Sequence, residues 1–502
     1  MRVAIVGAGV SGIAMAYELH RSGIDFTVFE RSAGPGGTWF DNTFPGCEVD
    51  VEAHGYAFPF MPHDWARSYP AQAEILSYLN YTIDHFGLSG YFRYNTAVES
   101  VTWIDERNLY EVRTAGGEQS EYDVVVSCLG LLNNPKLPTW PGLEDFAGPK
   151  FHTARWDHSV ALPGQRVAVV GTGSTASQLV PALAELGAEV ILFQRTPGWV
   201  LPKGERDYTD RERARWVRHQ SLQRLARYRH VRVRSSRKRY RGLRMAETKQ
   251  QQVLRQSAVR YIESQVKDPE VRAQVTPPFP IGCKRIILAS TFYAALNRPE
   301  VTLIPHAVER VTPAGVVDAT GQHHDIDILV MATGFTAQQY LATLRVYGQG
   351  GRSLHEAWGK SARAYFGTTV PGFPNFFMLY GPNTNGPVSQ TLTSARQARA
   401  VARTLRAMRR RRAQAVDTRP AAYDWFVRWM DAGNAKLTSN HPRFCRNYYY
   451  AEDGRNVTQF PFREPMHKFI WNTSFGLGLT FRASPPGRRR ASPRQPTAAA
   501  AE

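Results

Sequence analysis

The chain has 502 residues, of which 43% are hydrophobic and 12% are aromatic. This composition excludes an intrinsically disordered chain and leaves enough apolar material for two or three domains. The sequence contains no run of about 18 uninterrupted apolar residues and opens directly on an apolar strand pattern, so we expect neither a membrane span nor a signal peptide.

The formal net charge is +19 at pH 7, and much of it lies in one segment. Between Arg211 and Arg244, thirteen arginines and Lys238 stand against a single acid, Glu212. Nucleic-acid binding is therefore a hypothesis about this segment and not about the whole chain. We favour a solvated helical face, and so we do not expect nucleic acid as a partner.

The cysteines are few and widely separated: Cys47, Cys128, Cys283 and Cys445. Their spacing matches neither a paired redox motif nor a zinc site, so we expect no metal. The same spacing makes structural disulfides improbable and favours a reducing, cytoplasmic location.

The N-terminus has the pattern of a βαβ nucleotide-binding unit. An apolar strand over residues 3–6 leads into a turn with Gly7, Gly9 and Gly12, then into a helix and a second strand that ends at Glu30. Glycines permit the tight turn, the approach of a pyrophosphate and close helix–strand packing, and the helix N-terminus attracts the phosphates. Glu30 can accept hydrogen bonds from both ribose hydroxyls, so this unit favours FAD or NAD.

A second unit with the same pattern begins at residue 166. Where the first unit has Glu30, it has Arg195. An acid there would repel a ribose 2′-phosphate, whereas arginine would bind it, and so we expect NADPH. The residues expected to hold NADPH in this unit are Gly171, Gly173, Ser174, Thr175, Arg195 and Thr196.

The rest of the sequence divides around these two units. Charged, helix-favouring sequence between 203 and 275 predicts a helical insertion, and Gly334 ends a later strand where we expect another FAD contact. The predicted fold is α/β, with two Rossmann-like domains. Its predicted parts are residues 1–145 and 329–480 for FAD, 146–160 for a linker, 161–202 and 276–328 for NADP, 203–275 for the basic insertion and 481–502 for a disordered tail.

Two longer patterns resemble the type I Baeyer–Villiger monooxygenases. The first follows the family fingerprint F-x-G-x-x-x-H-x-x-x-W-[P/D] at every defined position: Phe146, Gly148, His152, Trp156 and Asp157. The second begins with the run 36–39, continues through the run 44–46 and closes at Asp50. Four of its residues are expected to bind a cofactor: Gly37, Thr38, Trp39 and Asp50. The resemblance covers about residues 1–470. It implies an FAD- and NADPH-dependent enzyme that uses O₂ to convert a ketone into an ester or lactone through a peroxide carried on the flavin.

The resemblance also implies roles for single residues. A fixed cation would keep the flavin peroxide anionic and stabilise the negative charge of its adduct with the ketone. The family uses an arginine of a Lys-Arg pair, which corresponds here to Arg285, with Asp50 aiming it and Lys284 beside Arg195 on the 2′-phosphate. For His152 we favour a structural or hinge role at the domain junction.

Some alternatives stay open at this point. A flavin-containing monooxygenase that oxidises nitrogen or sulfur has the same cofactors, although Trp156 and the Asp50/Arg285 pair favour the ketone reaction. A disulfide reductase would need a closely spaced cysteine pair, which the sequence lacks. The aromatic run 444–462 could equally line the substrate pocket or pack in the core. The sequence does not indicate the ketone or the oligomeric state.

Overall fold

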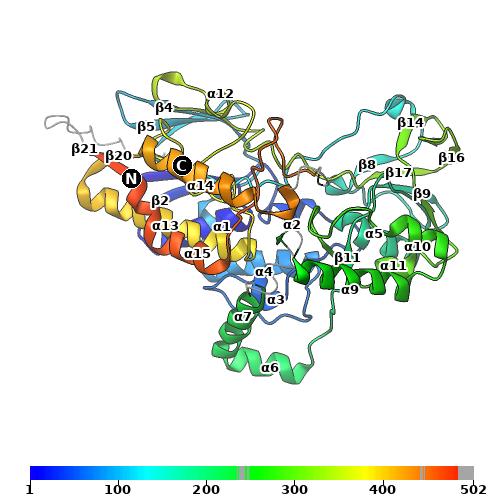
Figure 1. The fold of residues 1–502 in the computed structure, drawn as a ribbon. Coiled ribbons are helices and arrows are strands. Elements are labelled where there is room, and N and C mark those ends of the chain that lie inside the picture. The colour runs from blue at the N-terminus through cyan, green and yellow to red at the C-terminus, as the bar shows by residue number, and fades with distance from the viewer. Residues whose placement is uncertain (235, 237–243, 246–247, 441–444, 446, 484–502) are drawn as a thin grey trace, which may run out of the picture.

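The computed structural model describes residues 1–234, 236, 244–245, 248–440, 445 and 447–483. Two five-stranded parallel sheets lie on opposite sides of the molecule, each covered by helices (Figure 1). This is the predicted α/β fold with two Rossmann-like domains.

The first sheet holds the first glycine turn. Its strand order is β19-β7-β1-β2-β3, and all its strands run parallel. Strand β7 is fully buried, because helices pack on the face that carries Val124 and Val126 and a small antiparallel sheet packs on the face that carries Val125. This two-sided cover explains its apolar run 124–126. The strands are β1 Arg2–Val6, β2 Asp25–Phe29, β3 Phe92–Arg93, β7 Val124–Ser127 and β19 Phe376–Met378, and the main helices are α1 Val10–His20, α4 Gln72–His85 and α13 Gln390–Arg411.

The second sheet holds the second glycine turn, in the order β13-β10-β9-β17-β8. Its strands are β8 Lys150–His152, β9 Arg166–Val170, β10 Glu189–Phe193, β13 Val301–Ile304 and β17 Ile328–Met331, with helices α5 Ser174–Glu185 and α11 Phe292–Ala295. Two boundaries differ from the prediction. Strand β8, inside the predicted linker, forms the edge of this sheet, and β17 carries the domain past residue 328, because both pair in register with a neighbouring strand of the sheet.

Smaller sheets and helices complete the two domains. They are β4 Val98–Ile104, β5 Leu109–Thr114, β6 Gln119–Tyr122 and β18 Arg345–Tyr347; β14 Val308–Thr312, β15 Gly315–Asp318 and β16 His323–Asp325; β11 Val200–Leu201 and β12 Ile287–Leu288; and helices α2 Thr38–Asp41, α3 Ala53–Tyr56, α12 Leu354–Trp358, α14 Pro420–Asn434 and α15 Glu464–Phe469. The pair β11–β12 is short but important, since Arg285 lies just before β12.

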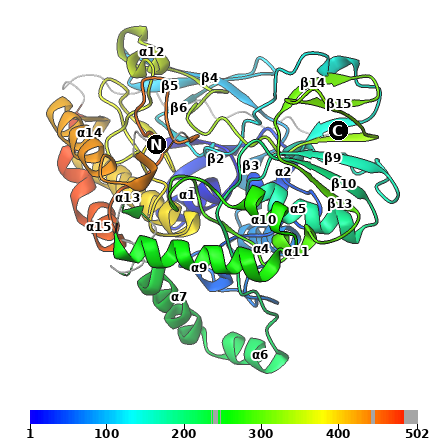
Figure 2. The same cartoon turned by 45° about the vertical axis from the view of Figure 1, so that its right-hand side comes forward.

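The predicted insertion is helical: α6 Asp210–Arg218, α7 Gln220–Arg234, α9 Lys249–Gln265 and α10 Pro269–Val275. Helices α6 and α7 project below the rest of the molecule, and α9 runs across its front in Figure 2. Some of the basic residues make docking contacts: Arg227 donates to the backbone oxygens of His54 and Phe58, and Arg213 pairs with Asp64 at 2.8 Å. Residues 235 and 237–243 of the basic segment lie outside the described residues.

The structure corrects the predicted start of the tail. Residues 481–483 belong to β21 Leu479–Ala483, which pairs antiparallel with β20 Ala413–Thr418. The ring of Phe481 lies 4.5 Å from the Arg411 guanidinium carbon, a cation–π contact that helps to hold this strand. The remainder of the predicted tail, 484–502, lies outside the described residues.

The prediction of no disulfide is wrong, because the structure has one between Cys283 and Cys445. The two residues are 162 positions apart, and only the fold brings them together. Cys47 and Cys128 are free. None of the helices in the described part of the chain combines the length and the apolar character needed to cross a bilayer.

Candidate functional site

The first glycine turn is shaped for a phosphate group. Gly7 has a φ of +104°, and a Cβ on Gly12 would lie 1.9 Å from the Gly7 carbonyl oxygen, so neither position tolerates a side chain. Gly9 precedes the first residue of α1 and forms a bridge with Gly36, whose amide donates to the oxygen of Ala8 at 3.0 Å. The unpaired amides at the start of α1 therefore face a surface of bare backbone, as a pyrophosphate requires.

Glu30 lies directly after β2, buried and held in place. Its Oε2 accepts a hydrogen bond from the Ala8 amide at 2.7 Å and its Oε1 accepts one from the Ser32 amide at 2.9 Å. A carboxylate has about four lone-pair sites, so two remain for ribose hydroxyls. The predicted role of Glu30 therefore fits the observed geometry.

The Gly-Thr-Trp segment closes over this turn. A Cβ on Gly37 would lie 3.0 Å from the Cα of Gly9. Thr38 begins the short helix α2, and Trp39 is buried, with its Nε1 donating to the Tyr56 hydroxyl at 2.8 Å. These predicted FAD residues thus share one place in the fold.

The second glycine turn is similar but more open. Gly171 has a φ of +122°, and a Cβ there would lie 2.5 Å from the oxygen of Ala332. A Cβ on Gly173 would meet no described atom within 4 Å, and this glycine precedes α5, whose first residues are Ser174 and Thr175. Thr196 accepts a hydrogen bond through its backbone oxygen from Thr172 at 3.0 Å, which ties the turn to the end of β10.

Two cations meet beyond the end of β10. Arg195 is exposed there, and Lys284 comes close enough that their charges interact. Burial lowers the pKa of Lys284 and the Arg195 charge lowers it further. Two neighbouring cations repel one another until an anion lies between them, and a ribose 2′-phosphate is suited to that place. Lys284 therefore lies near Arg195, and the binding of a 2′-phosphate by the two residues stays a prediction.

Arg285 and Asp50 form an ion pair between Nη2 and Oδ2, across 235 positions of sequence. The Asp50 carboxylate raises the pKa of Arg285, whose side chain is 42% exposed, so the guanidinium stays charged at any working pH. Tyr448 and Tyr449 lie near the same guanidinium. The structure thus contains the predicted ion pair between Asp50 and Arg285.

The aromatic run contributes both to this site and to the core. Tyr449 and Phe460 are buried, whereas the Tyr448 side chain is 41% exposed. Burial raises the pKa of Tyr449, which keeps its phenol protonated. Residue 444, at the start of the predicted run, lies outside the described residues.

His152 has a defined tautomer. Its Nδ1 accepts a hydrogen bond from the Ala154 amide at 3.1 Å, so its Nε2 carries the proton and donates to the oxygen of Gly334 at 3.0 Å. Burial lowers the pKa of His152, which favours this neutral form. Gly334 lies just past β17, where the chain leaves the second sheet, so His152 joins the linker to the crossing between the domains.

Three of the other fingerprint residues pack the linker against the second sheet, and the fourth, Asp157, makes a local contact. Phe146 is buried, and a Cβ on Gly148 would lie 2.3 Å from the oxygen of Asp327. The Trp156 ring packs edge-on against Phe151, with 5.0 Å between centroids. Asp157 accepts hydrogen bonds from the amide and hydroxyl of Ser159. Every one of these contacts is structural.

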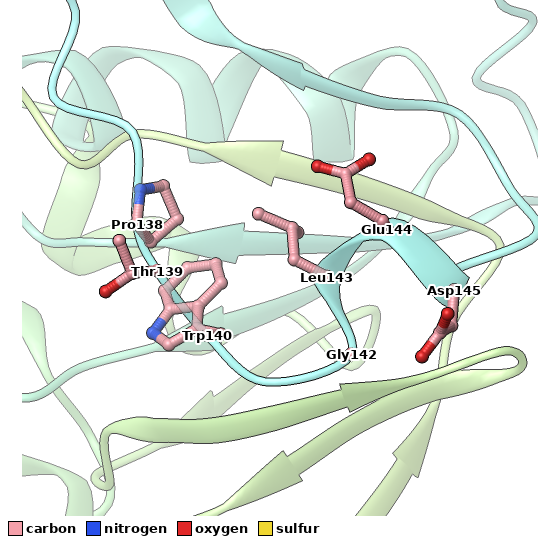
Figure 3. Close-up of a pocket in the computed structure, with 7 residues that line it drawn as sticks. All are labelled: Pro138, Thr139, Trp140, Gly142, Leu143, Glu144 and Asp145. Atoms are coloured by element: carbon pink, nitrogen blue, oxygen red, sulfur yellow. The ribbon is translucent and has the colours of Figure 1, made fainter.

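Sequence reasoning missed a second ion pair beside Asp50, between Lys203 and Glu48 at 2.5 Å. Lys203 belongs to no recognised motif, and Glu48 stands at an undefined position of the second family pattern, so the sequence carried no signal for their pairing. A hollow of about 340 Å³ lies elsewhere, on the segment before the fingerprint (Figure 3). Its lining is Pro138, Thr139, Trp140, Gly142, Leu143, Glu144 and Asp145, which includes none of the predicted site residues.

Several known proteins resemble this chain. A model of the flavin-binding monooxygenase-like family matches residues 1–211. A Baeyer–Villiger monooxygenase of Pseudomonas aeruginosa is 37% identical over 466 residues, which cover 92% of this chain and 87% of the relative. Another from Streptomyces coelicolor is 38% identical over 471 residues, covering 92% and 89%.

Solved structures agree with these relatives. The oxidised, NADP-bound steroid monooxygenase superposes with a TM-score of 0.87 at 28% identity, covering 96% of this chain and all of that one. The closed form of cyclohexanone monooxygenase gives 0.86 at 26% identity, covering 96% and 99%. A complex of OTEMO with FAD and NADP gives 0.85 at 25% identity, covering 95% and 99%.

Proposed function

This chain belongs to the Baeyer–Villiger monooxygenases, and we propose that Arg285, held by Asp50, is the cation on which its oxygenation of a ketone depends. The chain is an FAD- and NADPH-dependent enzyme that uses O₂ to convert a ketone into an ester or lactone. The family, the reaction and both cofactors predicted from the sequence are confirmed.

The two glycine turns divide the cofactors between them. FAD would be held by Gly7, Gly9, Gly12, Glu30, Gly37, Thr38, Trp39 and Asp50, with Gly334 at the crossing between the domains, and NADPH by Gly171, Gly173, Ser174, Thr175, Arg195, Thr196 and Lys284. The bare backbone at Gly9 and the two neighbouring cations support this division. When bound, reduced FAD supplies the chemistry that activates O₂ and delivers one oxygen atom to the substrate.

Arg285 suits the charge that the reaction develops. Addition to the ketone places negative charge on the former carbonyl oxygen, and a guanidinium can donate hydrogen bonds to it. Asp50 engages one terminal nitrogen of Arg285, which fixes the plane of the guanidinium and leaves other N–H groups for the substrate. The observation that carries the proposal is this ion pair, because it joins loops of both nucleotide domains at one point.

The test is Arg285→Ala in the FAD-loaded enzyme. We expect the variant to bind FAD and be reduced by NADPH at the normal rate, while ester formation falls by about 10²–10³-fold or more, as expected when a donor to a developing oxyanion is removed. Arg206→Ala is the control, because Arg206 forms an exposed ion pair with Glu212. Undiminished ester formation in Arg285→Ala would contradict the proposal.

A further inference from the structure

A second ion pair lies in the loop that carries Asp50. Lys203 Nζ lies 2.5 Å from Glu48 Oε1, and the Lys203 side chain is fully buried, with Glu48 20% exposed. The same ammonium lies 5.0 Å from the centroid of the Tyr69 ring. A buried lysine with one carboxylate partner is costly to disrupt, because removing either partner leaves an uncompensated buried charge.

Both ion pairs connect the same two pieces of structure. Strands β11 and β12 pair in parallel; Lys203 follows β11 by two residues and Arg285 precedes β12 by two. Their partners, Glu48 and Asp50, are also two residues apart, in one loop of the first domain. One loop of the first domain therefore places two carboxylates against two cations that flank the β11–β12 pair of the second domain.

The backbone around the Lys203 pair is fixed from both sides. The Gln178 side chain donates to the oxygen of Glu48 at 3.0 Å and accepts from its amide at 3.4 Å, which attaches the loop to helix α5. The Lys203 amide donates to the Ser290 hydroxyl at 3.0 Å, and that hydroxyl donates to Glu205 at 2.6 Å. The Lys203–Glu48 pair is thus rigidly mounted on the NADP side.

We propose that Lys203 is a positioning residue for the oxygenation: its ion pair with Glu48 fixes the loop that carries Asp50 and thereby sets how Asp50 aims the Arg285 guanidinium. This inference rests on the proposed role of Arg285. Lys203 itself does not touch the reacting atoms. Its effect reaches them through the loop from Glu48 to Asp50 and through the attraction between its charge and the Asp50 carboxylate.

The experiment uses the FAD-loaded enzyme with Lys203→Met, Lys203→Arg and Glu48→Gln. In Lys203→Met we expect ester formed per NADPH oxidised to fall by about tenfold to a hundredfold, the range that a small misplacement of a catalytic group can cause. The rate at which NADPH reduces the flavin should stay unchanged, because that step does not use Arg285. Lys203→Arg keeps the charge and should restore most of the ester yield.

A second readout does not depend on activity. The amide of Val49 donates to the oxygen of Pro70, and that of Gln72 to the oxygen of Cys47, so both report on the loop that carries Asp50. We expect hydrogen exchange at these two amides to speed up in Lys203→Met, and the dissociation constant for NADP⁺ to change little.

The control is another largely buried ion pair, Arg396–Glu464, which lies at 2.5 Å with both side chains 14% exposed, between α13 and α15. Glu464→Gln should lower thermal stability and leave the ester yield per NADPH unchanged. If Lys203→Met behaves like Glu464→Gln, the positioning role is wrong. If Lys203→Met does not fold, Glu48→Gln decides in its place, with an unchanged yield again overturning the inference.

The result for Arg285→Ala separates the two proposals. If Arg285→Ala loses ester formation while Lys203→Met and Glu48→Gln keep it, the positioning role fails and the proposed function stands. If Arg285→Ala keeps ester formation, both fail.

Discussion

At the scale of single residues, we expect Arg195 to select NADPH over NADH. It is exposed at the end of β10, close to Lys284, so a 2′-phosphate between them would receive charge-assisted hydrogen bonds. Arg195→Ala should raise the KM for NADPH by about 10- to 100-fold, the equivalent of one hydrogen bond to a charged group, and leave the KM for NADH nearly unchanged. Steady-state kinetics with both nucleotides measures this.

The control for that measurement is Arg310→Ala, another exposed arginine, on β14 and outside the candidate site. It should change neither KM. An equal rise in both KM values for Arg195→Ala would contradict the assignment of the 2′-phosphate to this residue.

Some residues of the site could be predicted and others could not, for a physical reason. Glu30 and Arg195 occupy positions that the βαβ geometry fixes relative to a glycine turn, so their local sequence is sufficient. Asp50 and Arg285 were paired through the family resemblance. No local pattern pairs Lys203 with Glu48, since their contact depends on how two domains meet.

At the scale of elements, the helical insertion docks on α3 through His54. The His54 ring packs edge-on against Trp216 of α6 with 4.0 Å between centroids, and Arg227 of α7 donates to the His54 oxygen. Burial lowers the pKa of His54 to about 4, with the Arg227 charge adding to the effect.

This pKa makes the stability of the protein depend on pH. An unfolded histidine has a pKa of about 6.5, so between that pH and about 4 the unfolded chain binds a proton that the folded chain does not. Above pH about 6.5, His54 is neutral in both states and does not lower the free energy of unfolding. As the pH drops from about 6.5 towards about 4, the free energy of unfolding should fall by up to about 1.4 kcal/mol per pH unit. Urea unfolding at pH 7.5 and 5.5 measures the change.

His54→Phe keeps a ring at this position and removes the proton, so its stability should depend less on pH than that of the wild type. The difference between the two proteins in how their free energy of unfolding changes with pH isolates the contribution of His54, because the other titrating groups are common to both. His219→Phe, at an exposed position, should retain the wild-type dependence. A His54→Phe variant with the wild-type pH dependence would exclude this histidine as the cause.

The elements themselves were predictable to different degrees. Both glycine turns and the insertion helices follow from local patterns of glycine, charge and apolar spacing. The edge strands β8 and β21 do not, since each is short and exists only because a partner strand lies beside it. Strand β17 was itself predicted, but its sequence does not indicate which sheet it joins, so the predicted NADP part ended at 328, inside this strand.

At the scale of the whole molecule, the disulfide Cys283–Cys445 is the contact that the sequence argued against. It joins the residue directly before Lys284 to the C-terminal part of the chain, which also carries Tyr448 and Tyr449. Asn447 reinforces the junction by donating to the oxygen of Cys283 at 2.8 Å. Cysteine spacing along the chain could not reveal this contact, because only the folded arrangement of the NADP domain and the C-terminal segment brings the two cysteines together.

The cross-link has a direct chemical consequence. Alkylation of the denatured protein without reductant should modify Cys47 and Cys128 alone, and prior reduction should expose Cys283 and Cys445 as well, which peptide mass spectrometry distinguishes. Because the bond links residues 162 positions apart, Cys445→Ser should destabilise the protein by about 2–4 kcal/mol, seen as a lower thermal midpoint. Cys128→Ser, which removes a free buried thiol, is the matched control and should leave the alkylation pattern of the other cysteines unchanged. Modification of all four cysteines without reductant would show that the thiols are reduced in the isolated protein.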